Sequence, residues 1–500
     1  MRTPRIAADQ VTVYITTDGS EPSDKSPVHH PPLLLTGTAL VRVLAVARDG
    51  TRRTAQAWYM ATSKLAAVPA PAETLPGLGV EHFAISDWGE GVPQLDDATS
   101  EVETWWPSCE LAVLEGLPSA RRPATLACLR YRGWFIAPYE GTYVFSLRSD
   151  GIARLGLGSL LVAQVKDAVS GGWQQGAIHL AKGYHPFTLC YGQGTGSSGR
   201  SLEVRVAEPG KRLQPLPELL LRRVAKNPDI TEDQGDPAAP WTVRLIGGAF
   251  TGSTKAKVEV LRIQPERLNI HVTTDGSEPT SSSPLYSKPI PISSTTRVRV
   301  LALAKSGDLK ASTEAWFIET RTHAADQVTG ETLPGLWSEH CSLKRWVNPV
   351  ASIDTMKANF TSWWPNAELA AYGIVPVHRW PDELFGLRWS GYFLAPVDGV
   401  YVFATNSDDA SRVTFGTVPV VRNDNLHADR WGYGAVALTA GYHQLGLLYG
   451  QGPGLRTMDV YVALSGQRLQ RLPDLLLRRP LQPPQRKGVL ADPGDESDQP

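Results

Sequence analysis

Two adjacent carboxylates, Asp408 and Asp409, are the residues of this sequence best suited to bind a metal ion. Calcium takes about six to eight oxygen ligands, and carboxylate and amide oxygens are suitable side-chain ligands. Asn406 precedes the pair, and Asn423 opens a second polar stretch further along the chain. These four residues are therefore the candidate calcium ligands, although two neighbouring carboxylates converge only if the backbone between them is strained.

Aromatic residues follow the same polar stretch. Trp431 and Tyr433 come shortly after it, and Asn425 lies within it. A flat aromatic ring with a polar edge can stack on a sugar face while amide groups bind the hydroxyls. We therefore predict these three residues as sugar ligands. The alternative remains open that Asp408-Asp409 is only a polar turn between strands, since short acidic loops discriminate poorly.

The chain contains an internal duplication. The segment TTDGSEP at residues 16–22 returns at residues 273–279, and Trp105-Trp106-Pro107 returns as Trp363-Trp364-Pro365. Most such pairs lie 258 residues apart, as Gly133 and Gly391 do, which is far longer than a solenoid or propeller repeat. The first copy has Asp150-Gly151 in place of the carboxylate pair, so only the second copy is expected to bind calcium and sugar.

Short strands separated by Gly, Pro and Asp dominate both copies. The segments at residues 41–47 and 298–304 are rich in valine and predict buried strands. Asp18-Gly19 follows an alternating apolar run, and this dipeptide is typical of a tight β-hairpin. Closely spaced strands with few helical periods predict an all-β fold made of sandwiches.

The shorter unit of each copy resembles the chitobiase/β-hexosaminidase C-terminal domain. The resemblance rests on TTDGSEP, on Ser283-Pro284-Leu285-Tyr286, and on the strand at residues 296–302. It implies a small immunoglobulin-like accessory sandwich rather than a sugar-cleaving barrel. In the first copy the opening strand would fall before Met1, so we expect that copy to be N-terminally truncated.

The longer unit resembles the protective-antigen type β-sandwich, the "PA fourteen" domain. The matching segments are residues 387–396, 398–403 and 407–409, followed by Ala440-Gly441-Tyr442. The resemblance implies a binding or packing module. In the fungal flocculins of that family, paired aspartates in this loop bind calcium and the calcium binds a sugar.

Together these features predict a tandem duplication of a small immunoglobulin-like sandwich plus a larger sandwich. The expected boundaries are 1–66 for the truncated small sandwich, 72–223 for the first large sandwich, 224–240 for a linker, 241–322 for the complete small sandwich, 330–479 for the second large sandwich and 481–500 for a disordered tail.

Composition excludes several classes of function. The net charge of −1 gives no electrostatic reason to expect nucleic acid as a partner, and no stretch has the ~18 continuous apolar residues of a membrane span. The N-terminus lacks the apolar core of a signal peptide, and the four cysteines do not recur between the copies. Both observations favour an intracellular location.

No sequence pattern of a catalytic centre is found, so we predict a non-enzymatic binding module. Its expected ligand is carbohydrate, bound by the second large sandwich with calcium as the possible cofactor. Two alternatives stay open: a scaffolding protein that binds other proteins without any sugar, and the accessory part of a longer glycoside-processing enzyme.

Overall fold

The computed structural model describes residues 11–29, 33, 35, 39–59, 64–72, 74–83, 95, 98–111, 128–166, 172–192, 201–224, 242–245, 247–250, 252–261, 265–306, 310–319, 322–343, 353–369, 384–465 and 467–483. The chain divides into two compact units, Met1–Thr231 and Glu232–Pro500. The predicted linker and tail lie almost entirely outside the described residues.

The first unit begins with a three-stranded antiparallel sheet in the order β1-β2-β3. Its strands are β1 (Val11–Thr16), β2 (Ala39–Ala47) and β3 (Arg52–Tyr59). The predicted strand at residues 41–47 is therefore confirmed. The predicted hairpin at Asp18-Gly19 is found only as a reversal of the chain: Val28 forms an isolated antiparallel bridge with Tyr14, but the strand that pairs along β1 is β2. Gly19 does adopt a left-handed φ of 83°, but the turn opens a long connection between β1 and its partner β2.

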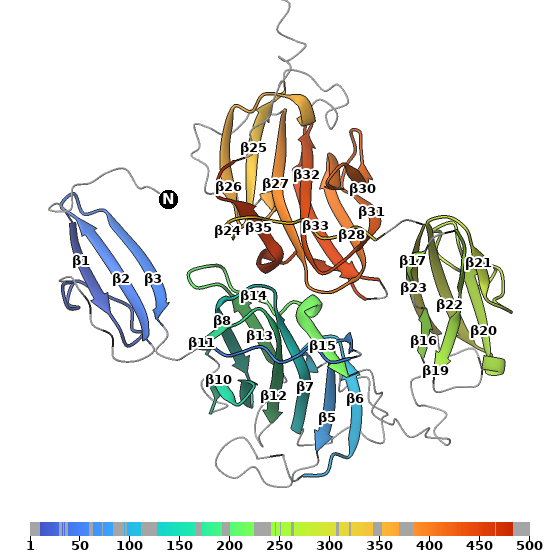
Figure 1. Ribbon diagram of the computed structural model, residues 1–500, viewed down its shortest axis with the longest axis horizontal. Helices are drawn as coiled ribbons and strands as arrows, with labels where there is room; N and C mark the ends of the chain where they lie inside the picture. The colour runs from blue at the N-terminus through green and yellow to red at the C-terminus, as the bar shows by residue number, and fades with distance from the viewer. Residues whose placement is uncertain are drawn as a thin grey trace, which may run out of the picture. The chain divides into compact units, whose positions relative to one another are not determined.

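The rest of the first unit forms two sheets. One has eight strands in the order β10-β9-β12-β7-β15-β4, with β5 paired to both β6 and β7, and the other has the order β11-β8-β13-β14 (Figure 1). The strands are β4 (Thr74–Pro76), β5 (Leu78–Phe83), β6 (Val102–Trp106), β7 (Cys128–Ala137), β8 (Gly141–Ser149), β9 (Ile152–Leu157), β10 (Leu160–Val165), β11 (Gln174–Leu180), β12 (Gly183–Gly192), β13 (Leu202–Ala207), β14 (Gln214–Pro215) and β15 (Leu221–Val224).

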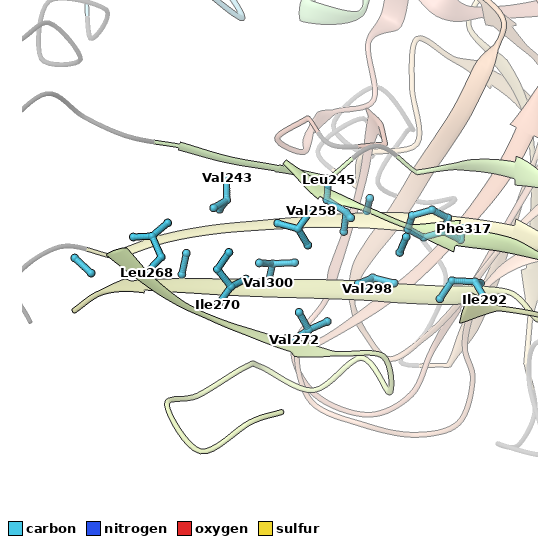
Figure 2. Close-up of a cluster of buried hydrophobic side chains, with 14 residues drawn as sticks. Val243, Leu245, Val258, Leu268, Ile270, Val272, Ile292, Val298, Val300 and Phe317 are labelled. Carbon is cyan, nitrogen blue, oxygen red and sulfur yellow. The ribbon is translucent and has the colours of Figure 1, made fainter. Parts of the chain in front are cut away.

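The second unit begins with the second small sandwich. Its main sheet has the order β17-β23-β22-β20, and two short ribbons, β16-β19 and β18-β21, accompany it. The strands are β16 (Thr242–Leu245), β17 (Gly248–Phe250), β18 (Thr254–Ala256), β19 (Val258–Leu261), β20 (Leu268–Thr273), β21 (Ile290–Ile292), β22 (Thr296–Ala304) and β23 (Lys310–Glu319). Alternate apolar residues of β20 and β22 pack with Val243, Leu245 and Phe317 into one core (Figure 2).

The second large sandwich repeats the strand order of the first. Its eight-stranded sheet has the order β24-β35-β27-β32-β29-β30 with β25 and β26 alongside, and its four-stranded sheet has the order β31-β28-β33-β34. The strands are β24 (Thr332–Pro334), β25 (Leu336–Ser342), β26 (Phe360–Trp364), β27 (Phe385–Ala395), β28 (Gly399–Asp408), β29 (Ala410–Phe415), β30 (Val418–Asn423), β31 (Arg430–Leu438), β32 (Gly441–Gln451), β33 (Thr457–Leu464), β34 (Gln470–Arg471) and β35 (Leu477–Pro480).

Aromatic side chains from both sheets meet in the core of each large sandwich. In the second copy Phe393 of β27 meets Phe403 of β28 edge to face at 5.3 Å between ring centroids. Phe135 and Phe145 make the same contact at 5.3 Å in the first copy. The predicted all-β class is confirmed, and among the described residues η4 (Glu218–Leu220), η5 (Pro265–Arg267) and η8 (Asp474–Leu476) are single 3₁₀ turns.

The first and last strands of each large sandwich are neighbours in one sheet. β24 pairs with β35 in antiparallel register, with Thr332 opposite Pro480. In the first copy β4 pairs with β15, with Thr74 opposite Val224. The chain therefore enters and leaves each large sandwich at the same edge.

Candidate functional site: an aromatic sheet face beside an acidic turn

The four-stranded sheet of the second large sandwich has one face in the core and one face outside it. Along β28, Tyr401 and Phe403 are buried against Phe393, so Ala404 and Asn406 are on the opposite, outer face. Residues directly opposite each other in an antiparallel pair share a face, and the register therefore determines the neighbours of these two residues.

The register brings three aromatic residues to this outer face. Ala404 lies opposite Tyr433 of β31 and Tyr461 of β33, and Asn406 lies opposite Trp431 of β31. The Trp431 and Tyr433 rings are stacked, with centroids 5.9 Å apart and planes 18° apart. The Tyr461 ring lies 4.9 Å from the Trp431 ring. We refer to these three residues as the aromatic row.

The small side chain of Ala404 explains how rings from β31 and β33 can meet across β28. Ala404 is fully buried, whereas Trp431 is 44% exposed and Tyr433 is 38% exposed. A larger residue at position 404 would separate the rings. The aromatic row is therefore a supported platform, with accessible ring surface at Trp431 and at the part of Tyr433 that Arg297 does not cover.

Charged side chains flank the aromatic row at Tyr461. Arg471 forms an ion pair with Asp459 at 3.0 Å and a second one with Glu368 at 3.4 Å, and its guanidinium lies 5.9 Å from the Tyr461 ring centroid. Burial raises the pKa of Asp459 above its usual range, and the charge of Arg471 opposes that shift.

A second guanidinium flanks Tyr433. Arg297 of β22, in the small sandwich, lies 4.8 Å above the Tyr433 ring centroid. The same Arg297 Nη2 donates to both carboxylate oxygens of Glu314 at 2.9 Å. Strand β23 of the small sandwich also covers part of this sheet face, since Ile318 packs with Val400 and Ala437.

The acidic turn, Asp408-Asp409, lies at the end of β28, and its peptide bond is cis. The Asp409 carboxylate accepts backbone N–H bonds from His427 at 3.0 Å and from Gly452 at 2.6 Å. The Tyr449 hydroxyl donates to the Asp408 carbonyl at 2.5 Å. Asp409 thus connects the β30–β31 loop to the segment after β32.

The Asp408 carboxylate differs from that of its neighbour. Asp408 is 8% exposed, and among the described residues its carboxylate oxygens have no hydrogen-bond donor. Burial raises its pKa, and the charges of Asp409 and Asp429 raise it further. A cation at this position would relieve the cost of that buried charge.

The two predicted asparagine ligands of the metal have different surroundings. The Asn423 Oδ1 accepts a 2.7 Å hydrogen bond from Arg430 Nε, and its Nδ2 donates to Ser407 Oγ at 3.0 Å. The Asn406 Oδ1 is buried and has no hydrogen-bond partner among the described residues. Asn425, with a φ of 77°, is exposed in the loop between β30 and β31.

The donor set fits calcium in part. Asp408 and Asp409 bring hard oxygen ligands close together, as calcium requires, whereas Asn423 could contribute its oxygen only if Arg430 moved. No group of three or more His, Cys, Asp or Glu residues suited to a metal was found among the residues that the structure describes. Amide and backbone oxygens would therefore have to complete a calcium site.

The first large sandwich carries different chemistry on the corresponding face. Arg148 and Glu203 lie opposite each other, at the positions of Asn406 and Asp459. The guanidinium groups of Arg148 and Arg205 lie 4.9 and 4.5 Å from the Trp173 ring centroid. Glu203 forms ion pairs with both arginines. The ring of Trp173 is thus already in contact with cations of its own domain.

The structure adds residues that the sequence analysis missed. Tyr461, Asp459 and Arg471 belong to β33 and β34, far along the chain from the predicted site residues. The alternation of polar and apolar residues from Met458 to Val462 could have indicated that Asp459 and Tyr461 face outwards. Their position beside Trp431 depends on strand register, which that alternation does not give.

Comparison with known proteins identifies two domain families. Residues 3–56 and 247–314 match the model of the chitobiase/beta-hexosaminidase C-terminal domain, and residues 375–471 match that of the PA14 domain. No curated protein matches the chain. Among the described residues, no helix has the length and apolar character needed to cross a membrane.

Several solved structures are similar at low identity. An anti-sigma factor domain-containing protein from Clostridium clariflavum is 13% identical, with 81% of this chain and all of that chain covered and a TM-score of 0.24. A PA14 sugar-binding domain from an RTX adhesin is 17% identical, covering 30% of this chain and 99% of that one, with a TM-score of 0.26. The epithelial adhesin 9 A domain from Candida glabrata, in complex with Galb1-4GlcNAc, is 13% identical, covering 32% and 93%, with a TM-score of 0.24.

Proposed function

We propose that this chain, which contains chitobiase/beta-hexosaminidase C-terminal domains and a PA14 domain, binds carbohydrate through its second large sandwich. The observation that carries the proposal is the aromatic row on the outer sheet face. Sugar rings present C–H groups on their faces, and exposed aromatic rings with polar groups beside them suit such ligands. Trp431 and Tyr433 provide stacked rings, and Asn406 lies on the same face.

Calcium is the second part of the proposal. Asp408 and Asp409 would bind the ion, and Asn406 Oδ1, which lacks a hydrogen-bond partner in the described part of the chain, is the amide oxygen on the same strand. A bound calcium ion would neutralise the buried Asp408 charge and would offer open coordination positions to sugar hydroxyls. Asn425 would contribute an exposed amide from the neighbouring loop.

The two families matched are binding or accessory modules, and this supports a proposal of binding rather than catalysis. The aromatic row lies on a sheet face that β23 covers in part, and its neighbouring carboxylates are engaged by arginines. We therefore assign no reaction to this site.

The test is a glycan array followed by isothermal titration of the full chain, with and without a calcium chelator. Trp431→Ala and Tyr433→Ala should each weaken binding at least tenfold. Trp105→Ala is the matched control because Trp105 is similarly exposed, at 41%, and its ring contacts Arg223 at 4.7 Å. No sugar binding in either buffer would exclude the proposal. The better-supported function would then be that of a scaffold that binds other proteins.

The chelator separates the two parts of the proposal. Loss of sugar binding with chelator, and its recovery with added calcium, would support a calcium-dependent site at Asp408. Unchanged binding with chelator would remove calcium from the proposal while leaving the aromatic row in place. Calcium titration of Asp408→Asn gives the same distinction without any sugar, because this variant should lose metal binding.

A further inference from the structure

We infer that the second large sandwich contains an anion site, separate from the aromatic row, in which the guanidinium group of Arg479 binds a carboxylate. Arg479 lies on β35, which belongs to the eight-stranded sheet, whereas the aromatic row belongs to the four-stranded sheet (Figure 1). Three observations carry this inference: the two indole rings that contact the guanidinium group, its burial, and the lack of a counter-charge among the described residues.

Two tryptophan rings position the Arg479 guanidinium group. Its central carbon lies 4.7 Å from the ring centroid of Trp337 on β25 and 4.8 Å from that of Trp363 on β26. These two tryptophans lie directly opposite each other in the antiparallel pair of β25 and β26. The Trp337 indole is itself fixed, because its Nε1 donates to the Pro480 carbonyl at 2.9 Å. Cation–π contacts of this kind hold a guanidinium group without using any of its N–H groups.

Arg479 is a buried cation without a counter-charge in the described part of the chain. It is 7% exposed, and no described residue forms an ion pair or a hydrogen bond with its guanidinium group. Burial lowers the pKa of Arg479, and the charge of the adjacent Arg478 lowers it further. An arginine stays protonated in proteins, and a buried charge without a partner is costly. A bound anion would remove that cost.

The first copy accommodates the corresponding arginine differently. Arg223 contacts the Trp105 ring at 4.7 Å, and its Nη1 donates to the Val224 carbonyl at 3.5 Å. Gly79 lies opposite Trp105, so a second indole ring is absent at that position. Only the second of these two arginines therefore combines two contacting rings with N–H groups that no described residue uses.

A carboxylate suits this site better than a tetrahedral anion. Two parallel N–H groups of a guanidinium can bind both oxygens of a carboxylate, and the two planar groups then share one plane. The carboxylate oxygens thus stay away from the faces of the indole rings, which are electronegative. The out-of-plane oxygens of sulfate or phosphate would point towards those faces. The expected ligand is a small carboxylate, carried by a sugar acid or by an acylated amino acid.

Isothermal titration of the full chain, in a buffer free of carboxylates and phosphate, tests the site. Sodium glucuronate and sodium N-acetylglycinate represent the two sources of the carboxylate, and N-acetylglycinamide is the uncharged control. We expect saturable binding of at least one carboxylate, at least tenfold tighter than binding of N-acetylglycinamide, sulfate or phosphate. Binding of glucuronate alone would identify a sugar acid, and binding of N-acetylglycinate would identify an acylated amino acid.

Variants at position 479 locate the binding. Arg479→Gln should lower carboxylate affinity at least tenfold, because it removes the cation. Arg479→Lys should lower it at least fivefold, since an ammonium group keeps the charge but lacks the paired N–H groups. Arg456→Gln is the matched control, because Arg456 is an exposed arginine of the same domain that contacts the Phe385 ring at 5.3 Å. It should change the affinity less than twofold.

A spectroscopic measurement distinguishes the anion site from a purely structural contact. The NMR signal of the Arg479 Nε–H group, identified by its loss in Arg479→Lys, should shift when carboxylate is added to the native chain. This measurement and the Arg479→Lys titration also decide the question if Arg479→Gln does not fold.

Three results would overturn the inference. The absence of carboxylate binding to the native chain, or unchanged affinity in both variants at position 479, would leave Arg479 as a structural contact of two tryptophans. Tighter binding of sulfate or phosphate would overturn the carboxylate class of ligand. Sugar binding by the aromatic row is measured separately with neutral glycans, so none of these results decides it.

Discussion

His340 makes the second large sandwich sensitive to acid. It lies in β25, is 2% exposed, and its ring stacks on Phe360 with centroids 3.9 Å apart. Its Nε2 lies 3.1 Å from Ser362 Oγ. Burial lowers the pKa of His340 to about 4. Between about pH 4 and pH 6.5 the histidine is therefore neutral in the folded protein, whereas in the unfolded chain it is charged.

The size of the effect follows from the two pKa values. The pKa of an unfolded histidine is about 6.5, and each unit of difference corresponds to about 1.36 kcal/mol. Below about pH 6.5 the unfolded state binds a proton that the folded state does not, so the free energy of unfolding falls with pH until about pH 4. The loss reaches about 2 kcal/mol at pH 5 and about 3 kcal/mol at pH 4.

His340→Phe should remove this dependence, because phenylalanine keeps the stacking on Phe360 and cannot be protonated. Hydrogen exchange at the amides of β27 reports the stability of this sandwich separately from the other domains. Between pH 7 and pH 5 the native chain should lose about 2 kcal/mol more than the variant. His82, the buried counterpart in the first copy, is unchanged in both proteins and serves as an internal reference. Equal losses in the two proteins, or an NMR titration of His340 with a pKa near 6.5, would refute the reasoning.

Two further predictions concern packing. Gly434→Ala should prevent the second large sandwich from folding stably, because a Cβ there would lie 1.7 Å from the backbone oxygen of Val420. Thermal denaturation measures this loss of stability. Gly248→Ala is the control and should be tolerated, because no atom lies within 4 Å of a Cβ at that position. Arg388→Met should lower the free energy of unfolding by about 3–5 kcal/mol, since the variant removes the buried cation that binds Glu339 at 2.8 Å. Urea denaturation measures the loss, and a change below about 1 kcal/mol would contradict this account.

Much of the fold could be predicted from the sequence, because the patterns that indicate strands and turns lie within short segments of the chain. The valine-rich run at residues 298–304 forms most of β22, and the duplicated motifs correspond to the repeated strand order. The hairpin prediction holds only for the reversal that returns Val28 to Tyr14, because Asp18-Gly19 specifies a turn and not the strand that pairs along β1. The strand that pairs along β1 is determined by the apolar residues that complete the core. That strand is β2, which begins only at Ala39.

The site was predictable only in part for the same reason. Trp431 and Tyr433 belong to one strand, and their spacing of two residues indicates that they share a face. Tyr461 joins them through the register of β28 with both of its neighbours, which no local pattern specifies. The hydrogen bond from Arg430 to Asn423 is likewise a product of loop conformation, so the sequence could suggest Asn423 as a ligand without indicating that its oxygen is engaged.

The pairing of β24 with β35 has a mechanical consequence. Tension applied through the flanking chain would load this pair from the end at which Thr332 faces Pro480, so its hydrogen bonds would break one after another instead of all together. Strand β4 and its partner β15 have the same geometry in the first large sandwich. Each large sandwich would therefore begin to open by peeling at low force, and could lengthen the chain between two anchored points before its aromatic core is disturbed.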